Sequence, residues 1–276
     1  MWLTWQAALV LAMATFVVGR LWQNAARARL RSASAMTVET SIVLGLYSLW
    51  QWAGGLSVTK VNGAERRGRR IVEIQHALHL PSEVRLQKLF LPHPVWVEFC
   101  NGYYAIMHVP AIAAFLIWAF LRDRDRYARW RTTLAITTGA CLAVQLLPVA
   151  PPRMLPDLGY VDTALLYRQS VYSALGRGMA GQLAAMPSVH VAWAVLVGIG
   201  MWQLSTSGWR WLGAVHAFVT IVVVSATANH YWADGIVAVL ILAIAALIIT
   251  LAGRIFPSRP TALTVRPNVT SERTSA

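Results

Sequence analysis

The chain carries little charge. Only 13% of its 276 residues are Asp, Glu, Lys or Arg, whereas 57% are hydrophobic, and the mean hydropathy is +0.52. Soluble domains carry about 25% charged residues, so this composition excludes an ordinary soluble domain. Apolar runs of about 18 or more residues recur instead, which is the length needed to cross a bilayer core about 30 Å thick. The sequence therefore predicts an all-α, polytopic membrane bundle.

Acidic residues are scarcer still, with 11 against 24 Lys and Arg, and the formal net charge is +13. A basic balance often indicates nucleic-acid binding, but no soluble basic domain carries the charge here. We therefore expect no nucleic-acid partner. Basic residues in short loops between spans instead set the orientation of a membrane protein.

Cysteine is nearly absent. Cys100 and Cys141 lie in or beside predicted spans, which excludes a disulfide framework and indicates two small apolar side chains. His76 and His79 stand three residues apart, but no third metal ligand follows at a convincing spacing. We therefore expect neither a metal site nor a cofactor.

Seven helices account for the apolar runs, and we expect six or seven of them to cross the membrane. The first run could pass for a signal peptide, but no basic residue precedes it, and Arg20 follows it. We therefore interpret it as a span whose N-terminus lies outside. The expected helices cover 3–19, 38–58, 100–121, 132–149, 187–204, 211–228 and 232–253.

The distribution of Lys and Arg orients these spans. Inward segments hold 14 of them and outward segments 10, of which seven lie in 59–99. Long loops weigh less in orientation, and this one contains stretches that predict one or two short amphipathic helices in the membrane interface. We expect an N-terminal region over 1–97, a membrane core over 98–253 and a disordered cytoplasmic tail over 254–276, in the plasma membrane.

Polar residues gather at three span boundaries, around Arg153, His190 and His230. The two histidines are 40 residues apart, the length of one helix in and one helix back, so both emerge on the same membrane face. No span separates Arg153 from His190, so the arginine shares that face. By the charge count this face is extracytoplasmic.

These residue types suit phosphoryl transfer. Each histidine lies near the N-terminal end of an inward-running helix, where unpaired N–H groups and a partial positive charge favour anions. Asp234 would share a helix face with His230 and accept the proton at Nδ1, which leaves Nε2 as a nucleophile or base. Ser188 can donate its hydroxyl nearby, and Arg153 can neutralise phosphate oxygens. Such a site needs no metal.

Two motifs carry a resemblance to a known family. PSVH at 187–190, followed by HYWAD at 230–234, resembles the second and third motifs of the type 2 phosphatidic acid phosphatase superfamily. The resemblance covers about residues 98–253 and implies a phosphatase-like catalytic core there.

The resemblance also implies a role for each residue. His230 would be the nucleophile that forms a phosphohistidine, and Asp234 would orient it. His190 would protonate the leaving group, while Ser188 and Arg153 would hold the phosphate.

The chain departs from the common pattern of that family at two positions. No lysine precedes Arg153 in its motif, and Val223 and Val224 stand where the third motif has Ser-Arg. Arg168 and Arg177, in the outer loop, could replace the missing positive charge. The pattern is more similar to the branch that contains fungal inositol phosphorylceramide synthases and their actinobacterial relatives, which are inositolphosphotransferases.

The sequence thus favours an enzyme that acts on a lipid phosphate or diphosphate. Water would complete the reaction in a phosphatase, and a polyol or sugar acceptor would do so in a transferase. We favour the phosphatase because water is always available.

Plainer explanations stay open for each feature. His190 could be an interfacial side chain, the His-x-x-x-Asp pair structural, and the PPR stretch a helix stop. His108 and His216 lie inside predicted spans, where we expect neutral histidines bonded to neighbouring helices. The rival functions are a lipid transporter and a scaffold that holds anionic lipids through the basic segment 59–92.

Overall fold

The computed structural model describes residues 3–25, 27–56, 62–169 and 182–255, and all regular elements in these ranges are helices. The predicted all-α fold is therefore confirmed. The helices are α1 Trp5–Gln23, α2 Ala28–Leu56, α3 Ala64–Ala77, α4 Glu83–Phe90, α5 Pro94–Ile106, α6 His108–Arg122, α7 Arg124–Gln145, α8 Thr163–Leu166, α10 Val189–Leu204, α11 Arg210–Ala226 and α12 Trp232–Ile255, with two single 3-10 turns at Pro152–Met154 and Pro156–Leu158.

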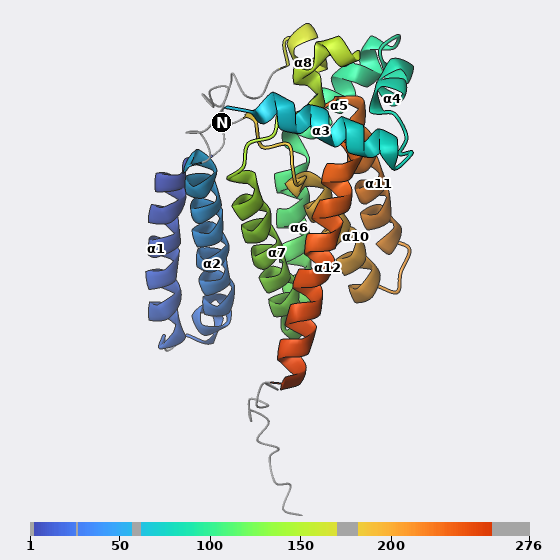
Figure 1. The fold of residues 1–276 in the computed structure, drawn as a ribbon. Coiled ribbons are helices and arrows are strands. Elements are labelled where there is room, and N and C mark those ends of the chain that lie inside the picture. Colours follow the sequence, from blue (N-terminus) through green and yellow to red (C-terminus); the bar gives the residue numbers. More distant parts are fainter. Residues whose placement is uncertain (1–2, 26, 57–61, 170–181, 256–276) are drawn as a thin grey trace, which may run out of the picture.

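The long helices run side by side, and the short ones gather at one end of the bundle (Figure 1). α1 and α2 form a hairpin that packs beside α7, while α10 packs against α6, α11 and α12. α3, α4 and α8 lie across the end at which α10 and α12 begin (Figure 1). This end therefore carries every segment that the sequence analysis singled out for phosphate chemistry.

The helix expected over 100–121 is broken. α5 and α6 meet at Met107 with a bend of 52°. Pro110 explains the break, because its ring lacks an N–H and clashes with the carbonyl four residues earlier, at Ile106, where α5 ends. The break places His108 at the first turn of a new helix rather than in the middle of a span.

Fewer helices qualify as spans than the six or seven expected. By length and composition α1 and α12 could each cross a membrane, and the α5–α6 pair would be a third crossing if counted as one span. α10 and α11 are apolar but have 16 and 17 residues, about 24–26 Å of helix, which is short for a core about 30 Å thick. α7 carries charged residues in its first turns, from Arg124 to Arg131.

The described residues of segment 59–99 form α3, α4 and the start of α5. α3 and α4 are the short helices predicted there, and their buried polar side chains face the protein. Glu83 of α4 accepts the backbone N–H of Trp232 at 2.9 Å, and Gln75 of α3 accepts that of Ala233 at 2.9 Å. Both side chains are buried. The first turn of a helix has N–H groups without partners inside the helix, so these two side chains act as caps for α12.

α3 lies very close to the loop before α12. A Cβ atom at Gly68 would lie 2.7 Å from the Tyr231 hydroxyl and 2.9 Å from the Ala150 carbonyl oxygen, distances that real Cβ atoms do not reach. Tyr231 donates its O–H to that same carbonyl at 2.8 Å. Only glycine therefore allows α3 to cover the region around residues 150 and 231.

We predict that Glu83→Ala lowers the free energy of unfolding by roughly 1–3 kcal/mol, because the buried N–H of Trp232 and the Tyr160 hydroxyl lose their acceptor. Thermal unfolding of the detergent-solubilised protein measures this effect. Glu73→Ala is the matched control, since Glu73 pairs only with Arg70 on the exposed face of α3. Equal melting temperatures for the two variants would contradict the capping role.

Candidate active site

The structure brings the three polar segments around Arg153, His190 and His230 together at one end of the bundle. Val149 donates its backbone N–H to Leu183 at 2.7 Å, and Ala185 donates its own to Val149 at 3.3 Å. These bonds join the segment before Arg153 to the segment before α10. Arg153 in turn donates its backbone N–H to the Ala228 carbonyl at 2.9 Å. Backbone contacts alone thus link all three segments.

His190 and His230 lie in direct contact. Nδ1 of His190 is 3.2 Å from Nε2 of His230, and the two ring centroids are 5.4 Å apart. His190 is in the first turn of α10 and half-buried, whereas His230 precedes α12 and is buried. The expectation that both histidines emerge at one end of the bundle is confirmed.

The hydrogen bonds of His230 define which nitrogen carries its proton. Nδ1 lies 2.7 Å from the carbonyl oxygen of Ala185 and 3.4 Å from Oδ2 of Asp234. A carbonyl oxygen only accepts, so Nδ1 carries the hydrogen and Nε2 has a bare lone pair. That lone pair faces His190, whose Nδ1 must then donate its own hydrogen.

Burial keeps His230 neutral. It lowers the pKa of the imidazole to about 4, and the Arg153 guanidinium acts in the same direction, while the hydrogen bond to Ala185 opposes both. At pH 7 the side chain therefore retains the lone pair that a nucleophile needs.

Asp234 has a smaller share in orienting His230 than the sequence suggested. Its Oδ2 accepts the backbone N–H of Tyr231 at 2.8 Å, a shorter contact than the 3.4 Å to His230. The reason is local: α12 begins at Trp232, so His230 lies before the helix and not on a shared helix face. The Ala185 carbonyl, which the sequence could not reveal, makes the closer contact.

The N-terminus of α12 is closed to anions, contrary to our expectation. Its first N–H groups, from Tyr231 to Ala233, donate to side chains of Asp234, Glu83 and Gln75. Two of these acceptors, Gln75 and Glu83, come from α3 and α4, helices whose role at this site the sequence does not reveal.

Ser188 caps α10. Its Oγ accepts the backbone N–H of Val191 at 3.3 Å, and its own backbone N–H donates to the Asp234 carbonyl at 3.2 Å. Ser188 is fully buried. A hydroxyl that accepts one bond still has its own hydrogen to donate, so the cap and a phosphate contact are chemically compatible.

Arg153 is buried in a network that the sequence did not predict. Its guanidinium donates to Asn229 Oδ1 at 2.8 Å and to Gln182 Oε1 at 3.0 Å, and its Nε lies 3.4 Å from Oδ2 of Asp162. The arginine side chain is 2% exposed. Asn229 is the residue before His230, so this network places a positive charge beside the histidine pair.

Arg168 and Arg177 are the residues that the sequence suggested as replacements for the missing positive charge. Arg168 follows α8, has a left-handed backbone with φ 55°, and its side chain is exposed. In the described ranges no hydrogen bond joins it to His190 or His230. Arg177 lies outside the described residues.

The positions that lack the family's cations are apolar and buried. Val223 and Val224 of α11 are each 2% exposed and pack with Cys100, Tyr104 and Val191. The apolar cluster continues under α10, the helix that begins beside His190. The positive charge that lies beside the histidine pair comes instead from Arg153, which bonds Asn229, the residue before His230.

His108 contributes a third imidazole that sequence reasoning did not assign to the site. Its ring centroid lies 4.3 Å from that of His190, and the Tyr104 centroid lies 4.7 Å from His190. Its Nδ1 contacts the carbonyl of Tyr104 at 3.1 Å, just before the break at Met107. Because Tyr104 belongs to α5 and His108 to α6, this is the expected bond to a neighbouring helix. Pro110 was the available signal for this break.

The titratable side chains show no arrangement for a metal. Over the described ranges, no group of three or more His, Cys, Asp or Glu residues is placed to hold an ion.

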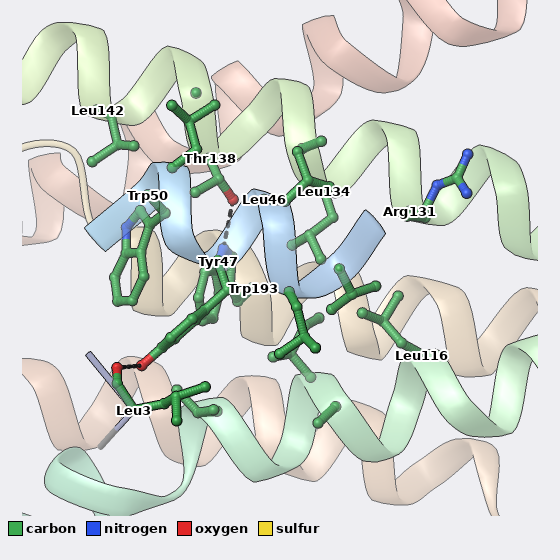
Figure 2. Close-up of a pocket in the computed structure, with 18 residues that line it drawn as sticks. Leu3, Leu46, Tyr47, Trp50, Leu116, Arg131, Leu134, Thr138, Leu142 and Trp193 are labelled. Atoms are coloured by element: carbon green, nitrogen blue, oxygen red, sulfur yellow. Dashed lines mark hydrogen bonds between the residues drawn. The ribbon is translucent and has the colours of Figure 1, made fainter. Parts of the chain in front are cut away.

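An apolar cavity of about 350 Å³ lies between the α1–α2 hairpin and helices α6, α7 and α10 (Figure 2). Trp193, three residues after His190, forms part of its wall and donates a hydrogen bond to Thr138 at 2.9 Å. The labelled side chains come mainly from α2 and α7 (Figure 2). Trp50 of α2 and Leu142 of α7 lie toward one end of the cavity, and Arg131 of α7 lies toward the other. The volume is within the range of small-molecule sites.

Comparison with known proteins finds a matching family model. A family model described as the PAP2 superfamily matches residues 69–248, from α3 to α12. No curated protein and no solved structure matches the chain significantly. The matched range contains every residue of the histidine pair, the arginine network and the α12 caps.

Proposed function

The chain belongs to the PAP2 superfamily, whose members are generally phosphatases or phosphotransferases, and on that premise we propose a membrane enzyme that cleaves a lipid phosphate or diphosphate through a phosphohistidine. One observation carries the proposal. The Nε2 lone pair of His230 faces Nδ1 of His190 at 3.2 Å, with the His230 tautomer fixed by Ala185. A nucleophile beside a proton donor is what phosphoryl transfer to histidine needs.

The first step forms a P–N bond. Nε2 of His230 attacks phosphorus while the bond from phosphorus to the departing oxygen breaks. His190 enters as imidazolium, a form favoured by the negative phosphate group, and gives a proton to that oxygen. Arg153 supplies positive charge beside the pair, and Ser188 donates its hydroxyl to a phosphate oxygen.

The second step breaks the P–N bond. Water attacks phosphorus, His190 takes the proton that the water loses, and phosphate leaves with Nε2 of His230 restored. In the resting protein the two imidazoles bond each other, so the phosphoryl group must first separate them.

A second candidate, headgroup transfer to a polyol or sugar, is favoured by the low positive charge of the site. The buried Val223 and Val224 leave Arg153 as the cation beside the histidines. A phosphodiester carries one negative charge and needs less compensation than a phosphomonoester dianion. In that case an alcohol replaces water in the second step, as in the inositol phosphorylceramide synthase branch.

The apolar cavity supports a lipid as the substrate. Its walls are almost entirely apolar. Of the residues in the wall, Val109 directly follows His108 in the chain, and Trp193 lies three residues after His190. Apolar cavities do not hold water well but do accept hydrocarbon. We place one hydrocarbon chain of the lipid there.

The same proposal includes the membrane arrangement. We propose that six or seven of the long helical segments cross the bilayer and that the histidine pair faces the extracytoplasmic side of the plasma membrane. Two apolar helices long enough to span a membrane support membrane association.

We predict that His230→Ala abolishes both catalysis and covalent labelling. Detergent-solubilised protein is mixed with ³²P-labelled phosphatidic acid or polyprenyl diphosphate, with and without inositol, and quenched in base, where phosphohistidine survives. His190→Ala should lower kcat by about 10²–10⁴, the usual contribution of general acid catalysis. Full activity in a folded His230→Ala variant would overturn the mechanism, and movement of lipid without phosphate release would favour a transporter.

Asp234→Asn should lower kcat by about 10²-fold and leave KM nearly unchanged. The expected loss is smaller than the ~10⁴ seen where a carboxylate alone fixes a catalytic histidine, because Ala185 still holds Nδ1–H of His230. Steady-state kinetics measure the two constants. An unchanged kcat would contradict the orienting role of Asp234, and a complete loss would show that the carboxylate dominates.

Gly139→Phe tests the cavity. Gly139 lines it, and a Cβ atom there meets nothing within 4 Å, so the backbone has room for the start of a new side chain beside the cavity. We expect KM for long-chain lipid phosphates to rise at least about tenfold, while short-chain analogues are unaffected. Gly45→Phe is the matched control, because Gly45 of α2 has equal space but does not line the cavity. Equal effects on both chain lengths would contradict a chain-binding cavity.

A further inference from the structure

His108 has an unused hydrogen-bond acceptor next to the proton donor of the site. Its Nδ1 lies 3.1 Å from the Tyr104 carbonyl, which only accepts, so Nδ1 carries the hydrogen and Nε2 has a bare lone pair. That Nε2 is buried and, in the part of the chain that the structure describes, has no hydrogen-bond partner. The residue is 5% exposed. Burying an unsatisfied acceptor costs free energy, which calls for an explanation.

The surroundings of His108 identify its partner. Its ring meets that of His190 edge to face, with centroids 4.3 Å apart and planes at 69°. The other ring contacts are the phenols of Tyr103 and Tyr104, with centroids 6.0 and 5.9 Å away. Imidazoles that share an N–H···N bond lie farther apart, as the 5.4 Å between the centroids of His190 and His230 shows. A bond between His108 and His190 therefore requires one ring to rotate and to shift slightly outward.

His190 needs such an acceptor during the reaction. A histidine that acts as an acid or base is normally oriented by a third group on its second nitrogen. In the resting structure Nδ1 of His190 is turned to His230, and no carboxylate contacts the ring among the described residues. Once a phosphoryl group separates the pair, the His190 imidazolium has two N–H groups, one for the departing oxygen and one without a protein partner.

We propose that His108 is a positioning residue: its Nε2 accepts the second N–H of His190 when the phosphoryl group separates His190 from His230. This inference rests on the proposed function. His190 gives one proton to the departing oxygen and keeps the other in the bond to His108, so no proton moves onto His108. An uncharged acceptor stabilises imidazolium less than a carboxylate does, which leaves His190 the stronger acid.

Two substitutions separate this role from packing. His108→Phe keeps a ring of similar shape but has no lone pair, whereas His108→Gln loses the ring and offers a side-chain oxygen as acceptor. We expect kcat to fall at least about tenfold in His108→Phe, with KM unchanged, and to recover largely in His108→Gln. A purely structural role predicts the opposite order, since phenylalanine preserves the packing better than glutamine.

Phosphate release from phosphatidic acid or polyprenyl diphosphate in detergent micelles is the assay, with thermal unfolding recorded for each variant. His216→Phe is the matched control, because His216 is a half-buried histidine that bonds Tyr103 at 2.6 Å rather than contacting His190. Wild-type kcat in His108→Phe, or glutamine worse than phenylalanine, would overturn the inference if His190→Ala is still impaired. An active His190→Ala variant, or no release by the wild type, would instead overturn the proposed function.

Discussion

The carbonyl oxygen of Ala185 accepts the Nδ1–H of His230 at 2.7 Å, and the remaining hydrogen-bond pattern of the site follows from that contact. Because Nδ1 carries the hydrogen, Nε2 presents a lone pair, and because that lone pair faces His190, Nδ1 of His190 donates to it. A shift of the segment around Ala185 would break this bond and allow the other tautomer of His230. Nε2, the proposed nucleophile, would then lose its lone pair to a proton. The bonds between Val149 and residues 183 and 185 hold this segment in place.

Helices α3 and α4 stabilise the same arrangement from above. Glu83 and Gln75 bond the first N–H groups of α12, and Gly68 lets α3 approach Tyr231, the residue after His230. Helices α3 and α4, which the sequence predicted to lie in the membrane interface, thus contact the loop that carries the proposed nucleophile. Because of these buried caps, the first N–H groups of α12 already donate to protein side chains and are not free to bind an anion. In the proposed function that helix end is therefore not available to the phosphate.

Periodicity and spacing predicted much of this fold. The apolar runs located the long helices, and the 40 residues between His190 and His230 placed both at one end, since chain length alone dictates a helix and its return. Contacts to backbone carbonyls were out of reach, because the Ala185 and Tyr104 carbonyls leave no mark on residue type. The network of Arg153 with Gln182 and Asn229 joins segments whose pairing depends on loop conformation. Pro110 is the sequence signal for the break that brings His108 to the site, because a proline ring clashes with the carbonyl four residues earlier, at Ile106.

Helix length relates the site to the position of a lipid phosphate. α10 and α11 have 16 and 17 residues, so a crossing made by them is shorter than a typical bilayer core and draws the start of α10, with His190, toward the hydrocarbon boundary. A lipid phosphate lies at that boundary, with its chains directed inward. The apolar cavity is lined by α2 and by Trp193, which follows His190 by three residues in α10. A lipid bound with its phosphate between the two histidines can therefore keep its chain within the membrane, and the headgroup need not be lifted into water to react.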